Sequence, residues 1–311
     1  MVEGHWGWLI AIYLFLGGMG AGSFLTAAVV ELSGHRYRHE FCPTSLIGAG
    51  VSGPLLAVGT VLLIFDLGAG LMEPWRIIWM FTNFSSVMTW GIWILSIFIP
   101  LCFVYGFLEL LDNYPGLYDW IRRFLRFLPE SFPFKHWRRV LAALGIVLAL
   151  GTALYTGILL SVVEAVPFWN TPILPLLFLV SAISTGMGLT IDMGATIALP
   201  EVHRRYKSLP IIHMVAIGAE ALLIAAVLLI ANGKGGVAAE SVHTMLAGVG
   251  APIFWGLVVV PGIIFPFIVH AYAIGARHHG LWSGILSGLG IVVAGLFLRY
   301  LIVFASIPVL L

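Results

Sequence analysis

The sequence predicts an all-α polytopic membrane protein with eight transmembrane helices. Hydrophobic residues occupy 60% of its 311 positions, and charged residues only 9%. A soluble domain usually carries about 25% charged residues, so this chain needs a bilayer in which its apolar side chains can face lipid. The length of its apolar runs supports the same class, because about 20 apolar residues are needed to cross the hydrocarbon core.

Eight apolar runs meet this length requirement. The first lies at the N-terminus, where the acidic Glu3 and the length of the run argue against a cleaved signal peptide. The expected helices span residues 8–30, 46–66, 85–110, 140–163, 173–198, 211–231, 251–274 and 283–306. We expect one integral membrane domain over residues 1–311, in which the first four and the last four helices form two four-helix bundles.

The positive charges of the loops predict the orientation of the helices. The loops after the first, third, fifth and seventh helices carry twelve lysines and arginines: Arg36, Arg38, Arg122, Arg123, Arg126, Lys135, Arg138, Arg139, Arg204, Arg205, Lys207 and Arg277. The opposite side carries Arg76 and Lys234. Because cytoplasmic loops are enriched in lysine and arginine, both termini are expected outside a prokaryotic cytoplasmic (inner) membrane. Aromatic and basic residues of segment 111–139 predict a short amphipathic piece at the inner surface.

Charge and cysteine content exclude several functions. The formal net charge is +1, and no basic patch interleaved with aromatic residues is present, so a nucleic-acid partner is not expected. The two cysteines, Cys42 and Cys102, are far apart and form no CxxC motif. We therefore expect no Fe–S cluster, c-type haem or structural zinc site, and no metal site, in this protein.

Polar residues within the apolar runs are the candidate functional residues, because a polar group at membrane depth is costly. An outer set lies near the predicted outer surface: Asp66, Tyr155, Tyr13, Thr89, Trp90, Arg299 and His5. A quinone head group needs hydrogen bonds to its carbonyl groups and a carboxylate or histidine that exchanges protons. Asp66 is the candidate catalytic residue and the others are candidate quinone-binding residues, although Tyr155 also suits an interfacial anchor and Arg299 a helix-pinning ion pair.

An inner set of ionisable residues predicts a proton pathway. Glu220 lies near mid-membrane, with Asp192 and His213 closer to the inner surface. Chains of Asp, Glu and His through a membrane are typical of proton relays. Glu31, Glu109 and His270 lie near the inner boundary, where a structural role is favoured. His213 and His270 also allow b-type haem ligation, which is the less favoured alternative because neither helix has a second histidine toward the outer side.

Several motifs resemble the NrfD/polysulfide reductase membrane-subunit family across nearly the whole chain. They are YLFLGGMGAGSFL (13–25), FDLG (65–68), EPWRIIWMFTNFSSVMTWGIWIL (73–95), YTGILLS (155–161), PFWNTPILPLLFLVSAISTGMG (167–188) and FLRYLIVFA (297–305). Each motif alone is weak, but their order and spacing together are fairly specific.

The resemblance implies a membrane subunit of a respiratory oxidoreductase with two four-helix bundles and no haem or Fe–S cluster of its own. It implies menaquinone or ubiquinone as an exchangeable substrate, bound near the outer face among the first four helices. The positions that carry over are Asp66, Tyr155 and the glycine-rich first helix; the helical histidine or asparagine that family members commonly use is absent. The implied partners are a four-cluster ferredoxin-like Fe–S subunit on the outer face and a molybdopterin catalytic subunit beyond it.

Two other functions remain open from the residues alone. A secondary transporter also places charges among broken membrane helices, although no inverted repeat is visible here. A passive membrane anchor for a catalytic subunit is the third possibility, against which the two polar layers argue.

Overall fold

Eight membrane-spanning helices dominate the structure, a computed structural model that describes residues 7–34, 42–66, 78, 81–124, 132–195, 208–276 and 281–307. Eight helical segments of the described residues are long and apolar enough to cross a membrane, which confirms the predicted class. In sequence order they are α1 (Trp8–Leu32), α2 (Cys42–Asp66), α4 (Val87–Asn113), α6 (Phe134–Ser161), α7 (Ile173–Met187) continued by η2 (Gly188–Ala195), α10 (Ser208–Lys234), α12 (Ala251–Ile253) continued by η3 (Phe254–Ile264) and α13 (Phe265–Ala276), and α14 (Leu281–Phe304).

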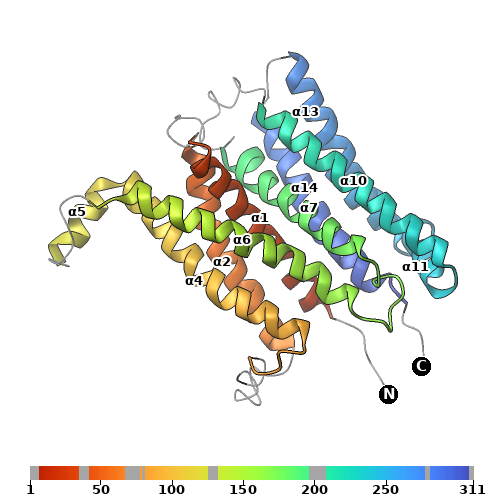
Figure 1. Cartoon of the computed structure of the whole chain (residues 1–311). Helices are drawn as coiled ribbons and strands as arrows, with labels where there is room; N and C mark the ends of the chain where they lie inside the picture. Colours follow the sequence, from red (N-terminus) through yellow and green to blue (C-terminus); the bar gives the residue numbers. More distant parts are fainter. Residues whose placement is uncertain are drawn as a thin grey trace.

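Two shorter helices lie at opposite ends of the spans (Figure 1). The first, α5 (Pro115–Phe124), falls in the segment where a short amphipathic piece was predicted, and its Trp120 is exposed. The second, α11 (Gly236–Leu246), was not predicted. It follows α10 through Gly235 and Gly236, whose φ angles of +70° and +52° suit glycine and turn the backbone at the end of the span.

The first turn of α1 and the last turn of α14 lie side by side at one end of the molecule (Figure 1). The ring of Trp8 stacks on that of Tyr300 with centroids 4.2 Å apart and also contacts Phe304. We refer to this as the outer end, because the loop charges predict that it faces outward; the opposite end is the inner end. The orientation itself stays a prediction.

Helix α1 holds the two halves of the protein together. It packs against α2 and α6 on one side and against α7 and α14 on the other. Its contact with α7 is backbone on backbone: a Cβ atom on Gly22 would lie 1.8 Å from the carbonyl oxygen of Ala182, and one on Gly186 would lie 2.2 Å from the carbonyl carbon of Gly22. Small residues allow such close approach of membrane helices.

We call α1, α2, α4 and α6 the first group, and the remaining spans the second group. Their separation into two independent four-helix bundles stays a prediction, since α1 and α7 share an extensive interface. Two of the second-group spans contain π-helical segments, η2 with 8 residues and η3 with 11. Pro261 lies inside η3, where its missing N–H interrupts the α-helical bonding. π-Helical turns rotate the following residues relative to an α-helix and often occur at functional sites.

The structure corrects the assignment of Arg138 to a loop. α6 begins at Phe134 rather than near residue 140, so Arg138 lies inside the helix and is fully buried. Its guanidinium forms ion pairs with Glu109 at 3.0 Å, Asp112 at 2.7 Å and Glu31 at 3.6 Å. The cluster therefore joins α1, α4 and α6 at the inner end, which supports the structural role favoured for Glu31 and Glu109.

Candidate functional site

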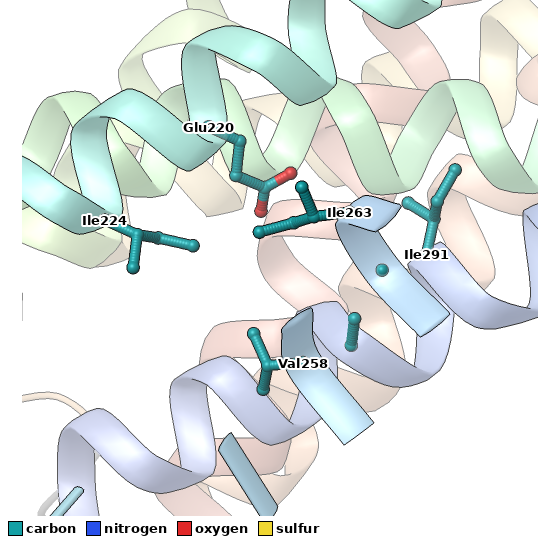
Figure 2. A pocket seen from close by; sticks show the side chains of 7 residues that line it. Glu220, Ile224, Val258, Ile263 and Ile291 are labelled. Carbon is teal, nitrogen blue, oxygen red and sulfur yellow. The ribbon is translucent and has the colours of Figure 1, made fainter. Parts of the chain in front are cut away.

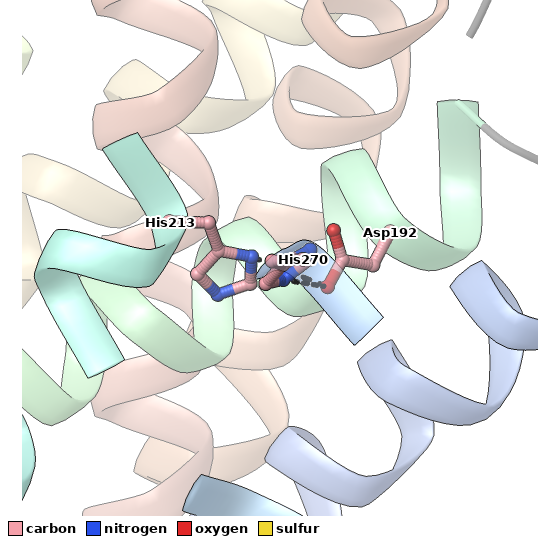
Figure 3. A group of neighbouring side chains, drawn as sticks. All are labelled: Asp192, His213 and His270. Carbon is pink, nitrogen blue, oxygen red and sulfur yellow. Dashed lines mark ion pairs between the residues drawn. The ribbon is translucent and has the colours of Figure 1, made fainter. Parts of the chain in front are cut away.

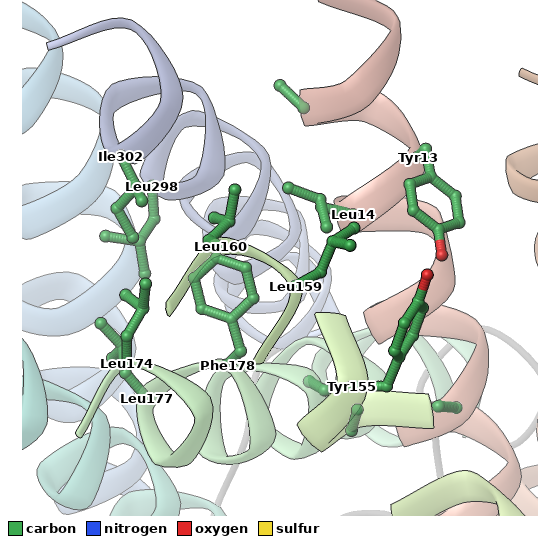
Figure 4. Close-up of a cluster of buried hydrophobic side chains, with 14 of the residues drawn as sticks. Tyr13, Leu14, Tyr155, Leu159, Leu160, Leu174, Leu177, Phe178, Leu298 and Ile302 are labelled. Carbon is green, nitrogen blue, oxygen red and sulfur yellow. The ribbon is translucent and has the colours of Figure 1, made fainter. Parts of the chain in front are cut away.

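Tyr13 and Tyr155 face one another at the centre of the first group. Their hydroxyl groups point toward each other from α1 and α6 (Figure 4). The two side chains are 1% and 4% exposed; the hydroxyls interact with each other, and neither makes a hydrogen bond of normal geometry with another described residue. Two buried hydroxyls in this state are available to a ligand, because an unsatisfied buried polar group costs about 1–3 kcal/mol.

Glycines on the other two helices of the group make room for the tyrosine rings. A Cβ atom on Gly91 of α4 would lie 1.9 Å from Cζ of Tyr155. Gly59 of α2 lies against Tyr13, with 3.6 Å between its Cβ position and the tyrosine Cδ2 atom. All four helices of the first group therefore shape this site.

An apolar cavity of about 140 Å³ lies between α2 and α4 next to these glycines. It is lined by Thr60, Leu63, Ile64, Phe81, Ile92, Leu95, Ser96 and Ile99. Thr60 directly follows Gly59 and Ile92 directly follows Gly91, so the cavity lies on the neighbouring faces of α2 and α4, and neither tyrosine lines it. Its volume is below the roughly 300 Å³ of a small ligand pocket, so only part of a larger molecule would fit in it.

Asp66 is half-buried at the outer end of α2. Its Oδ1 atom lies 3.4 Å from the Cβ position of Gly7, just before the first turn of α1. The contact of Gly59 with Tyr13 lies seven residues earlier on α2, and at 1.5 Å per residue this is about 10 Å along the helix. Asp66 therefore lies outward of the level at which Gly59 contacts Tyr13, whereas Gly91, which contacts Tyr155, precedes the α4 residues that line the cavity.

The structure separates the remaining members of the predicted outer set. Thr89 is buried in the first turn of α4. Trp90 lies apart from the tyrosines: its side chain is 56% exposed and its Nε1 donates a hydrogen bond to the carbonyl oxygen of Phe84, so it lies on the outside of the group. The physical reason is helical rotation, which turns residue 90 away from the side on which Gly91 contacts Tyr155. His5 lies outside the described residues.

Arg299 also lies apart from the tyrosine pair, on the other side of α1. It is fully buried between α14, α7 and α1, where Nη1 donates hydrogen bonds to Ser181 Oγ at 2.9 Å and to the carbonyl oxygen of Gly295 at 2.8 Å. On α1, Gly17 faces Thr156 of α6, whereas Gly18 faces the Arg299 guanidinium. Two adjacent residues of α1 thus face different sites: Gly17 faces the side of the tyrosine pair, and Gly18 faces Arg299.

Glu220 lies on α10 within the second group. Its carboxylate borders a small cavity between α10, η3 and α14 (Figure 2), lined by Ile224, Val258, Gly262, Ile263, Ile291 and Ala294. The cavity volume of about 10 Å³ is the size needed to hold roughly one water molecule. The cavity thus has room for about one water molecule beside the Glu220 carboxylate, and the other residues that line it are apolar.

Asp192, His213 and His270 meet at the inner end of the second group (Figure 3). Asp192 Oδ2 lies 3.2 Å from His213 Nδ1 and 3.4 Å from His270 Nε2. The alternative of a haem between the two histidines is not supported, because one carboxylate oxygen lies against both rings and their centroids are only 5.0 Å apart. The sequence places His270 in the inner set at the depth of His213 and favours a structural role for it; the structure brings it against Asp192.

The fold and these sites define a multi-pass membrane protein with an aromatic hydroxyl pair in one half and buried ionisable residues in the other. Residues 3–310 match the family described as polysulphide reductase, NrfD, and the protein belongs to this family. It is 31% identical to the C subunit of polysulfide reductase from Wolinella succinogenes, over 97% of its own length and 94% of that protein. It is 29% identical to protein NrfD of Escherichia coli over the same shares, and 28% identical to an NrfD homologue of Haemophilus influenzae over 86% and 83%.

Proposed function

We propose that this protein is the quinone-reactive membrane subunit of a respiratory oxidoreductase complex. The observation that carries the proposal is the Tyr13–Tyr155 pair, whose buried hydroxyls meet among four membrane helices, two of which, α2 and α4, enclose an apolar cavity. A quinone combines an apolar ring with carbonyl oxygens that accept hydrogen bonds. Tyrosine hydroxyls in an apolar wall provide both kinds of contact.

The quinone reaches the tyrosines between α2 and α4. Most residues that line the cavity there are partly exposed on the surface that faces lipid. The ring takes the part of the cavity nearest Gly91, where Tyr155 donates a hydrogen bond to one carbonyl oxygen, and the isoprenoid tail extends into the bilayer. The walls suit an apolar ring, since Thr60 and Ser96 are the only polar residues that line this cavity.

Asp66 exchanges the protons of the reaction with the outer aqueous phase. Oxidation of a quinol releases two electrons and two protons, and a charged intermediate is costly in an apolar pocket. The electrons pass to a partner subunit, and a carboxylate at the outer end of the cavity receives the protons. Asp66 lies about 10 Å outward of the level at which Gly59 contacts Tyr13. It is therefore the outer end of the proton transfer, and protons reach it through water or through movement of the quinone.

The partner subunits hold the redox centres. One similar protein is named as the C subunit of polysulfide reductase, a name that marks it as one part of a multi-subunit reductase. By this similarity we propose an Fe–S subunit with four clusters on the outer face and a molybdopterin catalytic subunit beyond it. The complex lies in the cytoplasmic membrane of a prokaryote, in keeping with eight apolar helices and bacterial relatives.

Glu220, Asp192 and His213 form a second, transverse proton pathway in this proposal. His213 and Glu220 lie seven residues apart on α10, which is two helical turns and the same face of the helix. A proton held by Asp192 and His213 at the inner end, and passed through the water-sized cavity beside Glu220, would cross half of the second group. This pathway supports a role in addition to anchoring, because a passive anchor has no need of buried acids.

Quinol turnover by the purified complex tests the proposal against the two alternatives. We expect menaquinol or ubiquinol analogues to reduce the Fe–S partner, and expect substitutions that fill the α2–α4 cavity, such as Leu95→Trp, to raise KM for the quinol. Leu222→Trp on the exposed face of α10 is the matched control. A complex that assembles but transfers no electrons from any quinol would leave the anchor function, and solute uptake in liposomes by the protein would favour the transporter.

Crosslinking locates the Fe–S partner. The electron donor must lie close to the quinone, so we expect crosslinks between the partner and segment 81–86 at the outer end of α4. Crosslinks found mainly to α5 would place the partner at the inner end and overturn this arrangement.

A further inference from the structure

Three buried side chains from three different helical segments converge on one point in the second group. Asp192 comes from η2, His213 from α10 and His270 from α13 (Figure 3). One ligand-type atom from each residue lies within 4.8 Å of the other two, and all three side chains are buried. Two imidazoles and one carboxylate are a ligand set that proteins use for divalent transition metals.

The hydrogen bond on the far side of His213 determines which of its nitrogens carries a proton. His213 Nε2 lies 3.2 Å from the backbone carbonyl oxygen of Ser184. A carbonyl oxygen only accepts hydrogen bonds, so Nε2 is the protonated nitrogen of the neutral imidazole. Nδ1 then presents its lone pair to the interior of the triad.

This leaves two electron-rich atoms facing each other. His213 Nδ1 lies 3.2 Å from Asp192 Oδ2, and Nδ1 makes no hydrogen bond of normal geometry among the described residues. An ionised carboxylate has no proton to donate, so the contact requires either a second proton on His213 or a cation bound between the two atoms. A bound metal cation satisfies both lone pairs at once.

The distances between the ligand atoms fit such a cation. A tetrahedral metal with bonds of about 2.0–2.1 Å separates its ligand atoms by about 3.3 Å. Asp192 Oδ2 lies 3.2 Å from His213 Nδ1 and 3.4 Å from His270 Nε2, so two of the three edges have this length.

The groups around the three side chains form hydrogen bonds to them of the kind that proteins use to orient metal ligands. The carbonyl oxygen of Ser184 accepts the outer N–H of His213, and Ser287 of α14 donates a hydrogen bond to Asp192 Oδ2 at 3.3 Å. Such outer contacts fix the tautomer and orientation of the ligands. Gly288 lets η2 approach α14 here, because a Cβ atom on it would lie 2.9 Å from Asp192 Cβ and 2.5 Å from the carbonyl oxygen of Gly188.

We propose that Asp192, His213 and His270 bind one divalent transition-metal cation, for which Zn²⁺ is the probe, with water as the fourth ligand. Three protein ligands leave the fourth tetrahedral position open. Water bound to such a cation releases a proton far more readily than bulk water, so the site would supply the proton at the inner end of α10. Metal binding does not depend on the quinone site, and the two proposals fail separately.

Metal titration of the full-length protein in detergent, without its Fe–S partner, tests the site. After chelation and desalting, we expect about one Zn²⁺ per molecule by isothermal titration and a tetrahedral Co²⁺ absorption spectrum on substitution. His270→Ala and Asp192→Asn should abolish stoichiometric binding. Ser287→Ala keeps all three ligands and should weaken binding about 10- to 100-fold, the typical effect of an outer contact. His243→Ala, on an exposed side chain of α11, is the matched control and should bind as wild type.

Folding is checked in the same samples. Helix content and the midpoint of unfolding of the metal-free protein should be unchanged in Ser287→Ala, so weaker binding there cannot be attributed to misfolding. The proposal is overturned if the wild-type protein binds no Zn²⁺ or Co²⁺ at micromolar concentrations, in which case a proton shared by Asp192 and His213 occupies the triad. It is equally overturned if His270→Ala and wild type bind with the same affinity.

Discussion

Gly91 lies so close to the ring of Tyr155 that any side chain at position 91 would displace it. A Cβ atom on Gly91 would stand 1.9 Å from Cζ and 2.2 Å from Cε2 of the tyrosine. The site at the centre of the first group thus depends on the absence of a side chain on α4 as much as on the presence of a hydroxyl on α6.

Gly91→Ala should therefore impair quinol oxidation although it adds only one methyl group. Displacing a binding group by about 1 Å is enough to lower kcat/KM on the order of 10²-fold. The measurement is steady-state turnover of the assembled complex. Gly218→Ala, in the middle of α10 with no atom within 4 Å of its Cβ position, is the matched control. Wild-type kinetics in Gly91→Ala would show that the position of Tyr155 does not matter to the reaction.

Tyr155→Phe should weaken quinone binding and leave the fold intact. The substitution removes one hydroxyl and keeps the ring that packs on Gly91. One hydrogen bond contributes about 1 kcal/mol, so KM for the quinol should rise roughly 5-fold. Tyr272→Phe, on an exposed side chain of α13, removes the same group elsewhere and should have no effect. An unchanged KM in Tyr155→Phe would remove the tyrosine from the site.

Asp66→Asn should lower turnover on the order of 10²-fold, the usual contribution of a general base, with assembly unaffected. The amide keeps the shape of the carboxylate next to α1 and removes its proton exchange. Asp119→Asn on the exposed surface of α5 controls for the loss of one negative charge. Should Asp66→Asn oxidise quinol at the wild-type rate, the carboxylate acts only on the N-terminal end of α1.

Arg138→Met should destabilise the first group, because it leaves the buried carboxylates of Glu31 and Glu109 without their cation. Breaking a buried ion pair on one side costs about 3–5 kcal/mol. The loss should be visible as a lower midpoint of unfolding in detergent. Adding Glu31→Gln and Glu109→Gln to the variant should restore part of the stability, since these two carboxylates are then neutral. Arg139→Met, on the neighbouring exposed residue, should unfold like the wild type, and equal unfolding of Arg138→Met would contradict the structural role of the cluster.

The sequence by itself determined the class of the protein. Length and apolarity of a run are local properties, so the eight spans could be located from it, and most of their ends agree with the structure to within a few residues. The start of α6 differs by six residues, because Lys135, Arg138 and Arg139 look like loop residues when their partners are unknown. The motifs also predicted the family, which the match over residues 3–310 confirms.

The tertiary structure decided which of the polar residues meet. The depth of a residue in the membrane follows from its position along a span. The direction in which its side chain points depends on the rotation of the helix about its axis, and this direction changes by about 100° with each residue. Gly22 and Gly186 fix the rotation of α1 against α7, and this places Tyr13 toward Tyr155 but Gly18 toward Arg299. The same reason brings His270 to Asp192 and turns Trp90 away from the cavity, because helix contacts far apart in the sequence set these angles and no local pattern encodes them.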